Sequence, residues 1–200
     1  MSGSTAAERG FLFFRRFLRN PREVGALCPS TRYLGEAMVR GLSLQPGDVV
    51  LEYGPGTGSL TDVIVPWVER TPGARYVGIE REQHFCDVLH RRFPAHEFVH
   101  GSVEDVRDLL AARTLPPPRA ILSGLPLILL PAMAQIVATA AAVLAPGGEF
   151  RTFSYVQSAP LRAARRLRRQ MRSTFASFHT SPLVLRNFPP AWVLCGRKAG

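Results

Sequence analysis

The sequence predicts an α/β fold: a mostly parallel, seven-stranded sheet with helices on both faces, preceded by amphipathic N-terminal helices. From residue 47 onward, short β-rich runs alternate with helical stretches, which is the order that a doubly wound parallel sheet requires. A glycine-rich turn separates the first strand from the first helix of this series. With 200 residues, of which 46% are hydrophobic, the chain has the length of one domain with a sizeable core. We therefore expect an N-terminal helical segment over 1–46 and one α/β domain over 47–200.

Each element follows from its local pattern. Runs rich in β-branched and aromatic residues predict strands at 49–53, 76–80, 97–100, 119–123, 149–154, 174–180 and 192–196. Helical periodicity predicts helices at 59–69, 83–92, 103–112, 131–144 and 161–172. The uncharged stretch 120–146 is long enough to span a membrane, but Pro126 and Pro131 divide it into a strand and an alanine-rich helix.

Composition excludes several classes of protein. A charged fraction of 20% beside 46% hydrophobic residues is typical of a globular domain and excludes a disordered or fibrous chain. The cysteines, Cys28, Cys86 and Cys195, lack the spacing of a disulfide framework or a zinc site, which favours a reduced cytosolic compartment. The histidines show no metal-ligand spacing, so no metal is predicted.

The net charge of +10 is unevenly distributed. Residues 1–46 carry seven Arg against three Glu, 47–150 are acidic overall, and 151–200 carry nine Arg, one Lys and no acid. Basic ends around an acidic middle favour contact with an anionic surface, either nucleic acid or a membrane leaflet. Coding bias would explain the choice of Arg over Lys, but not the missing acids.

A glycine-rich run connects the first strand with the first helix: Glu52-Tyr53-Gly54-Pro55-Gly56-Thr57-Gly58-Ser59-Leu60. Glycines let the backbone turn sharply and approach a ligand closely. Glu80 ends the second strand, where its carboxylate can accept hydrogen bonds from both ribose hydroxyls of a nucleoside. The G-x-G-x-G spacing differs from that of dinucleotide enzymes and of phosphate loops. Strand, glycines, helix and acid together predict a cofactor site.

These residues resemble the class I S-adenosylmethionine-dependent methyltransferases over 47–200, with the glycine motif at Glu52, Gly54, Gly56 and Gly58 and the ribose-binding acid at Glu80. The resemblance implies a Rossmann-like class I methyltransferase fold and S-adenosyl-L-methionine as cofactor. Such enzymes often carry an Asp after the third strand, where this chain has Ser102 and Val103 as the expected adenine contacts. The implied cofactor site consists of Glu52, Gly54, Gly56, Thr57, Gly58, Ser59, Leu60, Glu80, Arg81, Ser102, Val103, Ser123, Gly124 and Leu125.

The residues at the end of the fourth predicted strand indicate which class of substrate is methylated. Nucleic-acid amino methyltransferases place Asn or Asp there, followed by two small or proline residues and an aromatic that stacks on a flipped base. This chain reads Ser123-Gly124-Leu125-Pro126-Leu127, so the aromatic is missing and base methylation is disfavoured. The apolar residues that follow, Ile128, Leu129 and Leu130, form either a rim of the substrate site or ordinary core.

The N-terminal segment predicts a membrane contact. On a helical wheel its phenylalanines fall on one half and its arginines on the other, a pattern typical of a helix in a membrane interface. The alternative is a helix packed on the domain with solvated arginines. The helix over 161–172 carries six further arginines on one face, so two basic helices can hold the protein on an anionic leaflet. The expected membrane contacts of the first helix are Phe11, Phe14, Arg15, Arg16, Phe17 and Arg19.

Several motifs narrow the resemblance to the bacterial phospholipid N-methyltransferases: Phe17-Leu18-Arg19-Asn20-Pro21, the 51–58 turn, Ser123-Gly124-Leu125-Pro126 and Asn187-Phe188-Pro189-Pro190-Ala191. That family implies stepwise N-methylation of phosphatidylethanolamine, through its mono- and dimethyl forms, to phosphatidylcholine. It also implies a cytoplasmic protein that is peripheral on the inner face of the cytoplasmic membrane. Its partner would be an anionic phospholipid surface and no nucleic acid.

Methyl transfer to an amine needs an acceptor for the amine proton. Tyr33 and His179 are candidate acceptors, Ser123 is expected to orient the amine, and Arg186 is expected to pair with the lipid phosphate. For each, ordinary packing or exposure is the alternative. Two other functions stay open: an RNA adenine N6-methyltransferase, favoured by the basic termini, and a membrane-binding module that retains the fold without turnover.

Overall fold

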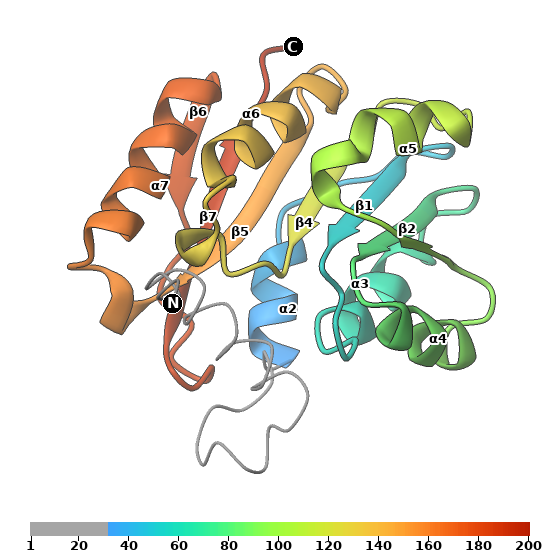
Figure 1. Cartoon of the computed structure of the whole chain (residues 1–200), viewed down its shortest axis with the longest axis horizontal. Helices are drawn as coiled ribbons and strands as arrows, with labels where there is room; N and C mark the ends of the chain where they lie inside the picture. Colours follow the sequence, from blue (N-terminus) through green and yellow to red (C-terminus); the bar gives the residue numbers. More distant parts are fainter. Residues whose placement is uncertain (1–31) are drawn as a thin grey trace, which may run out of the picture.

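A computed structural model describes residues 32–200 and, within them, a seven-stranded sheet in the order β3-β2-β1-β4-β5-β7-β6 (Figure 1). Strands β1 to β5 are parallel to one another, and β7 runs antiparallel to β5 and β6 on either side of it. The predicted mostly parallel, seven-stranded sheet is therefore confirmed. The strands are β1 Val49–Tyr53, β2 Arg75–Glu80, β3 Glu97–His100, β4 Ala120–Ser123, β5 Glu149–Tyr155, β6 Ser177–Thr180 and β7 Ala191–Arg197.

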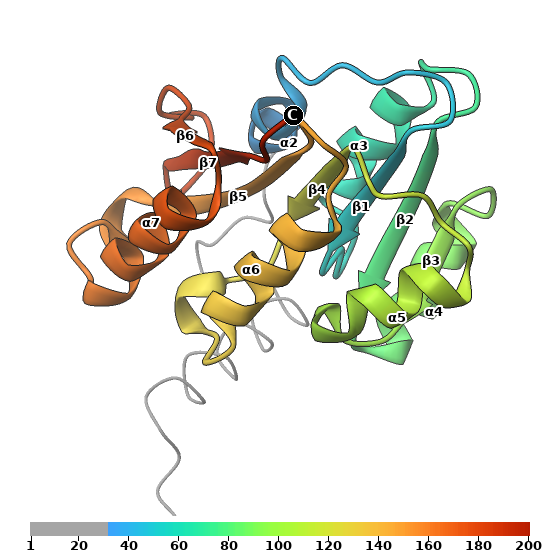
Figure 2. The ribbon, with the colours of Figure 1, turned by 90° about the horizontal axis from the view of Figure 1, so that it is seen from above.

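Helices cover both faces of the sheet, as predicted. Helices α5, α6 and α7 lie on one face, and α2 and α3 lie on the other (Figure 2). Leu89 of α4 belongs to the core on the α2 and α3 face. The bounds are α2 Arg32–Val39, α3 Thr61–Val68, α4 Gln83–Arg92, α5 Val106–Ala112, α6 Met133–Val143 and α7 Arg162–Thr174, with short 3-10 turns at Val103–Asp105, Leu127–Leu129 and Val156–Ser158.

The central strands are buried on both faces, which is why they read as continuous apolar runs. All five residues of β1 are buried, and they alternate between two cores. Val49 and Leu51 join the core under α5, α6 and α7, whereas Val50 joins the core under α2, α3 and α4. This two-sided burial fixes the register of β1 and so fixes where the glycine-rich turn begins.

The observed bounds differ from the predicted ones mainly around α7. The predicted strand over 174–180 is too long at its start, because α7 extends to Thr174 and β6 begins at Ser177. Phe175 stands between them and stacks on Phe150 with 6.0 Å between ring centroids, which turns the chain back onto the sheet. Within residues 32–200, no helix combines the length and apolar character needed to cross a bilayer.

The N-terminal prediction is tested only in part. Residues 32–39 are helical, but 40–46 are turns and irregular chain and not helix, in keeping with the left-handed φ of +75° at Gly41. The predicted membrane contacts of the first helix lie outside the described residues: Phe11, Phe14, Arg15, Arg16, Phe17 and Arg19. The proposed boundary between 1–46 and 47–200 therefore stays a prediction.

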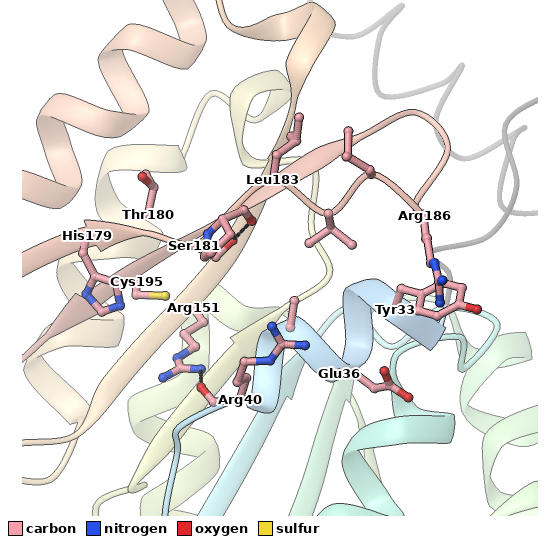
Figure 3. Close-up of a pocket in the computed structure, with 14 residues that line it drawn as sticks. Tyr33, Glu36, Arg40, Arg151, His179, Thr180, Ser181, Leu183, Arg186 and Cys195 are labelled. Atoms are coloured by element: carbon pink, nitrogen blue, oxygen red, sulfur yellow. Dashed lines mark hydrogen bonds between the residues drawn. The ribbon is translucent and has the colours of Figure 1, made fainter.

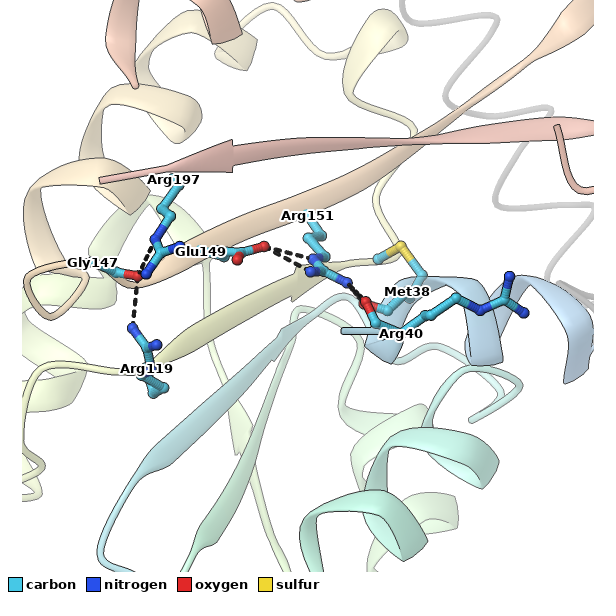
Figure 4. A network of polar contacts seen from close by, with 7 residues as sticks. All are labelled: Met38, Arg40, Arg119, Gly147, Glu149, Arg151 and Arg197. Carbon is cyan, nitrogen blue, oxygen red and sulfur yellow. Dashed lines mark hydrogen bonds and ion pairs between the residues drawn. The ribbon is translucent and has the colours of Figure 1, made fainter. Parts of the chain in front are cut away.

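A buried guanidinium joins α2 to the sheet (Figure 4). Arg151 of β5 is 4% exposed, and its Nη1 donates to the carbonyl oxygens of Met38, at 3.0 Å, and Arg40, at 2.7 Å. Its Nε and Nη2 donate to Glu149 Oε2 at 2.9 and 2.7 Å. The carbonyls at the end of a helix have no partner within the helix, so Arg151 supplies donors that α2 otherwise lacks.

We expect Arg151→Met to lower the free energy of unfolding by about 3 kcal/mol, because it leaves Glu149, whose side chain is only 15% exposed, without its cation. Urea denaturation of purified protein measures the loss. The matched control is Arg113→Met, which breaks the Arg113–Glu97 pair at side chains that are 31% and 38% exposed; there we expect less than about 1 kcal/mol. Equal losses in both variants would show that Arg151 does not anchor α2.

Candidate active site

The predicted cofactor residues gather at one edge of the sheet, where the parallel strands end. The glycine-rich turn follows β1, Glu80 ends β2, Ser102 follows β3, and Ser123 ends β4 (Figure 1). The chain leaves β1 and β4, which are neighbours, toward helices on opposite faces of the sheet. In open α/β sheets, a crevice for ligands forms where neighbouring connections diverge in this way. The arrangement therefore places the candidate site at the carboxyl ends of β1 and β4.

The glycine-rich turn takes a backbone conformation that side chains rarely allow. Gly54, Gly56 and Gly58 have φ values of +66°, +57° and +88°. A Cβ atom on Gly54 would lie 2.4 Å from Leu125 Cδ2, and one on Gly124 would lie 2.9 Å from the Gly54 carbonyl oxygen. The ends of β1 and β4 therefore approach each other closely, and they present backbone where side chains would otherwise stand.

Glu80 holds the glycine-rich turn from β2. The residue is 7% exposed, and its Oε2 accepts a hydrogen bond from the Gly56 amide at 2.9 Å. Its Oε1 accepts from the Glu82 amide, also at 2.9 Å. Burial raises the pKa of the Glu80 carboxyl, while these backbone hydrogen bonds oppose the rise. Each carboxylate oxygen can accept more than one hydrogen bond, so Glu80 retains capacity for two ribose hydroxyls.

Glu52 lies fully buried beneath the turn. Its Oε2 accepts hydrogen bonds from the Tyr76 hydroxyl at 2.6 Å and the Thr61 hydroxyl at 2.9 Å. Its Oε1 has no hydrogen-bond partner among residues 32–200. Burial raises the pKa of the Glu52 carboxyl to about 7, although the two hydroxyls act against the rise. A buried acceptor without a partner fits a site that receives a donor, such as the amino group of the cofactor's methionine part.

The remaining predicted cofactor residues are close by, but their side chains are engaged locally. The Ser102 hydroxyl accepts from the Glu104 amide at 3.2 Å, and the Ser123 hydroxyl accepts from the Leu125 amide at 3.3 Å. Arg81 is exposed, and its carbonyl oxygen lies 3.1 Å from His100 Nε2. The positive-φ turn, the acid of β2 and the unpaired Glu52 oxygen fit S-adenosylmethionine, whereas the individual contacts stay predictions.

The sequence pattern did not single out Arg92, the last residue of α4. Its Nη1 donates to the Thr57 carbonyl oxygen in the glycine-rich turn, and its Nη2 donates to Asp62 Oδ1 of α3 at 2.6 Å. One guanidinium therefore ties the turn to the helix that follows it. Arg92 comes 35 residues after Thr57, so only tertiary packing brings the two together.

The structure divides the predicted catalytic residues, and the predicted substrate contact Arg186, between two places. Tyr33, His179 and Arg186 line a pocket of about 500 Å³ beside α2 (Figure 3), where the Arg186 guanidinium lies 5.1 Å from the centroid of the Tyr33 ring. Ser123 is fully buried at the end of β4. His179 belongs to β6, three strands from β4, which corresponds to about 14 Å across the sheet. His179 and Ser123 are therefore not brought together.

The pH dependence of stability tests the state of Glu52. The Glu52 carboxyl has a pKa of 4.5 in the unfolded chain and about 7 in the folded chain, so the free energy of unfolding falls as the pH rises between these values. The full loss is about 3 kcal/mol and is reached above the folded pKa. In Glu52→Gln this loss is absent. Between about pH 5 and about pH 8, the free energy of unfolding measured in urea should therefore rise for the variant relative to the natural protein. A constant difference across this range would show that Glu52 is not protonated on folding.

Arg92→Met tests the support of the glycine-rich turn. The turn loses its tie to α3, so we expect the dissociation constant for S-adenosylmethionine in isothermal titration calorimetry to rise roughly tenfold. The control is Arg91→Met, which removes the neighbouring exposed arginine and leaves Thr57 and Asp62 in place. An unchanged constant for Arg92→Met would mean that the turn holds its shape without Arg92.

Comparisons with known proteins agree with this geometry, although no protein-family model matches the chain. Ornithine lipid N-methyltransferase of Singulisphaera acidiphila is 32% identical over 186 residues, which cover 90% of this chain and 92% of that protein. Ribosomal RNA small subunit methyltransferase A of Cupriavidus metallidurans is 40% identical over 64 residues, but these cover 32% of this chain and 21% of that protein.

The solved structures show the same fold. Magnesium protoporphyrin IX methyltransferase of Synechocystis, a crystal structure with bound S-adenosylmethionine, matches with a TM-score of 0.61 at 11% identity, over 100% of this chain and 86% of that one. The predicted methyltransferase fold and the predicted cofactor, S-adenosylmethionine, are thus confirmed. This chain belongs to the class I S-adenosylmethionine-dependent methyltransferases, in the family of the ornithine lipid N-methyltransferase of Singulisphaera acidiphila.

Proposed function

We propose that the chain N-methylates phosphatidylethanolamine and its mono- and dimethyl forms toward phosphatidylcholine, on the inner face of the cytoplasmic membrane. The observation that carries the proposal is the likeness, over 90% of the chain, to a methyltransferase whose substrate is a lipid amine. Phosphatidylethanolamine and ornithine lipid both present a primary amine at the head of an apolar body. The shared chemistry is therefore amine methylation on an amphiphile.

The substrate side of the site supports an amphiphile over a nucleobase. After β4 the chain continues through Leu125 to Leu130, in which Leu127 is 2% exposed and the other residues are partly exposed. Leu127 is thus core and Leu130 packs against it, whereas Leu129 is available as an apolar rim. The Ser123 hydroxyl faces its own turn, so no polar side chain at this position is directed at a base amine.

The reaction requires the neutral form of the amine, because its lone pair must attack the methyl group. Bound S-adenosylmethionine supplies that methyl group on a sulfonium that is already activated. A primary amine has a pKa near 10, so a base must remove its proton or bind it after the attack. The main task of the chain is to hold the amine in line with the methyl group and to exclude competing water.

Tyr33 is the better placed of the two candidate proton acceptors. It lies in the first turn of α2, and a Cβ atom on the nearby Gly35 would stand 2.7 Å from Val63 Cγ2 of α3. Helix α3 itself begins directly after the glycine-rich turn, so this close packing brings the first turn of α2 to the cofactor edge. His179 stands three strands away from β4. We therefore assign proton acceptance to Tyr33 and an anion contact to Arg186, which stacks on it.

Ornithine lipid is a second candidate substrate, favoured by the name of the relative that matches nearly the whole chain. Its head group carries a carboxylate where phosphatidylethanolamine carries a phosphate. The guanidinium of Arg186 can pair with either anion, so the site does not discriminate between the two lipids by charge alone.

Transfer of labelled methyl from S-adenosylmethionine tests the proposal on three substrates in parallel: phosphatidylethanolamine in phosphatidylglycerol vesicles, ornithine lipid in the same vesicles, and ribosomal RNA. We expect labelled mono-, di- or trimethylated phosphatidylethanolamine, and no label after Glu80→Ala, because that change removes the expected ribose acceptor. Label found only in ornithine lipid would show that ornithine lipid, and not phosphatidylethanolamine, is the substrate. Label in RNA alone, or in none of the three despite cofactor binding, would refute lipid methylation.

A further inference from the structure

The large apolar side chains that residues 32–200 expose are gathered at one end of the domain. They are Tyr33 at 42%, Leu161 at 49%, Leu185 at 73% and Phe188 at 62% exposure. Tyr33 lies in the first turn of α2, Leu161 directly precedes α7, and the other two lie between β6 and β7. Exposed apolar residues scattered singly over a surface need no explanation, but four at one edge indicate a contact surface.

The strand register shows that this is the edge of the cofactor site. Strand β5 ends at Tyr155, which pairs with Ala191 at the start of β7. The connection that carries Leu185 and Phe188 enters β7 at this point, and the chain leaves β5 toward Leu161 from the same point. Figure 1 shows the first turn of α2, the start of α7 and the β6–β7 connection at the same end of the sheet.

The charges at this edge are separated between its two halves. The acids Glu82, Glu104 and Asp105 follow β2 and β3, on the half that is expected to hold the nucleoside. On the other half, at the carboxyl end of β5, the start of β7 and the end of β6, residues 151–200 supply no acid. The acid beside it is Glu36 of α2, which lines the pocket with Arg186 and is paired with Arg32. There Arg162 and Arg186 stand beside the exposed apolar side chains. Apolar side chains next to arginines, with the neighbouring acid Glu36 already paired to Arg32, complement the interface of an anionic bilayer.

The direction of α7 decides which of its arginines belong to this surface. The helix starts at the carboxyl end of β5 and leads to β6, which begins beside Arg197 at the opposite edge of the sheet. Its exposed arginines therefore form a stripe that leaves the cofactor edge. At 1.5 Å per residue, Arg169 and Arg172 lie about 10 Å farther from the edge than Arg162 and Arg165. This separation exceeds the Debye length of about 8 Å at physiological salt.

We propose that the carboxyl edge formed by β5, β7 and β6 docks on an anionic lipid bilayer. Leu161, Leu185 and Phe188 enter the head-group region, and Arg162, Arg165 and Arg186 face lipid phosphates. The inference rests on the proposed lipid substrate and adds the orientation of the protein on the membrane. The cofactor site opens toward the bilayer, so a head-group amine reaches it from there. It also restricts the sequence-based expectation, since the far half of the arginine stripe on α7 stays in solvent.

Co-sedimentation of the full chain with vesicles of phosphatidylethanolamine and phosphatidylglycerol tests the surface. Leu161→Asp with Leu185→Asp should weaken partition about tenfold or more. Both changes suit the fold, because Asp is favoured before a helix start and Leu185 is 73% exposed. Arg162→Gln with Arg165→Gln should weaken partition about thirtyfold.

The matched control is Arg169→Gln with Arg172→Gln, which removes the same charge from the far end of the same helix. Here we expect less than about a threefold change, because these positions lie beyond the Debye length. Equal effects of the two arginine pairs, or an unchanged partition of the double Asp variant, would overturn the docking surface. Methyl transfer to short-chain phosphatidylethanolamine below its micelle concentration needs no bilayer, so it reports separately whether the proposed reaction itself fails.

Discussion

The common direction of strands β1 to β5 is the constraint on which the site depends. Parallel strands with right-handed crossovers send every connection that leaves a strand to the same edge of the sheet. The glycine-rich turn, Glu80 and Ser123 meet at this edge although they are far apart in the chain. The same rule brings Leu161, which follows β5, to the edge of the predicted cofactor site. The expected cofactor site and the proposed membrane surface therefore lie at the same end of the domain.

At that edge the glycine-rich turn presents its backbone, and neighbouring side chains hold it in place. Glu80 accepts a hydrogen bond from the Gly56 amide, and Arg92 donates one to the Thr57 carbonyl. A backbone donor and a backbone acceptor of the turn are therefore both bound by side chains of neighbouring elements. Beneath them, Glu52 retains an oxygen without a partner among the described residues, at a cost in stability that rises with pH. A folded chain tolerates such a cost most readily where a ligand supplies the missing donor.

Helix α2 connects the stability of the sheet with the geometry of the site. Arg151 holds one end of the helix through the carbonyls of Met38 and Arg40. The other end carries Tyr33, which packs against Arg186 from the β6–β7 connection. A shift of the helix along the sheet would therefore move Tyr33 relative to the cofactor edge. Anchoring by a buried guanidinium, instead of by apolar contacts alone, fixes this position with directional hydrogen bonds.

The sequence by itself determined the parallel sheet, most strand bounds and the glycine-rich turn with Glu80, because these depend on local periodicity and on glycine conformations within a few residues. It also indicated the apolar chain after Ser123. Only the tertiary structure decided that Arg92 supports the turn and that His179 stands three strands from β4. Which arginines of α7 face the cofactor edge likewise follows from the path of that helix across the sheet. These relations join residues that are distant in the chain, and long-range packing, which leaves no periodic signal, sets them.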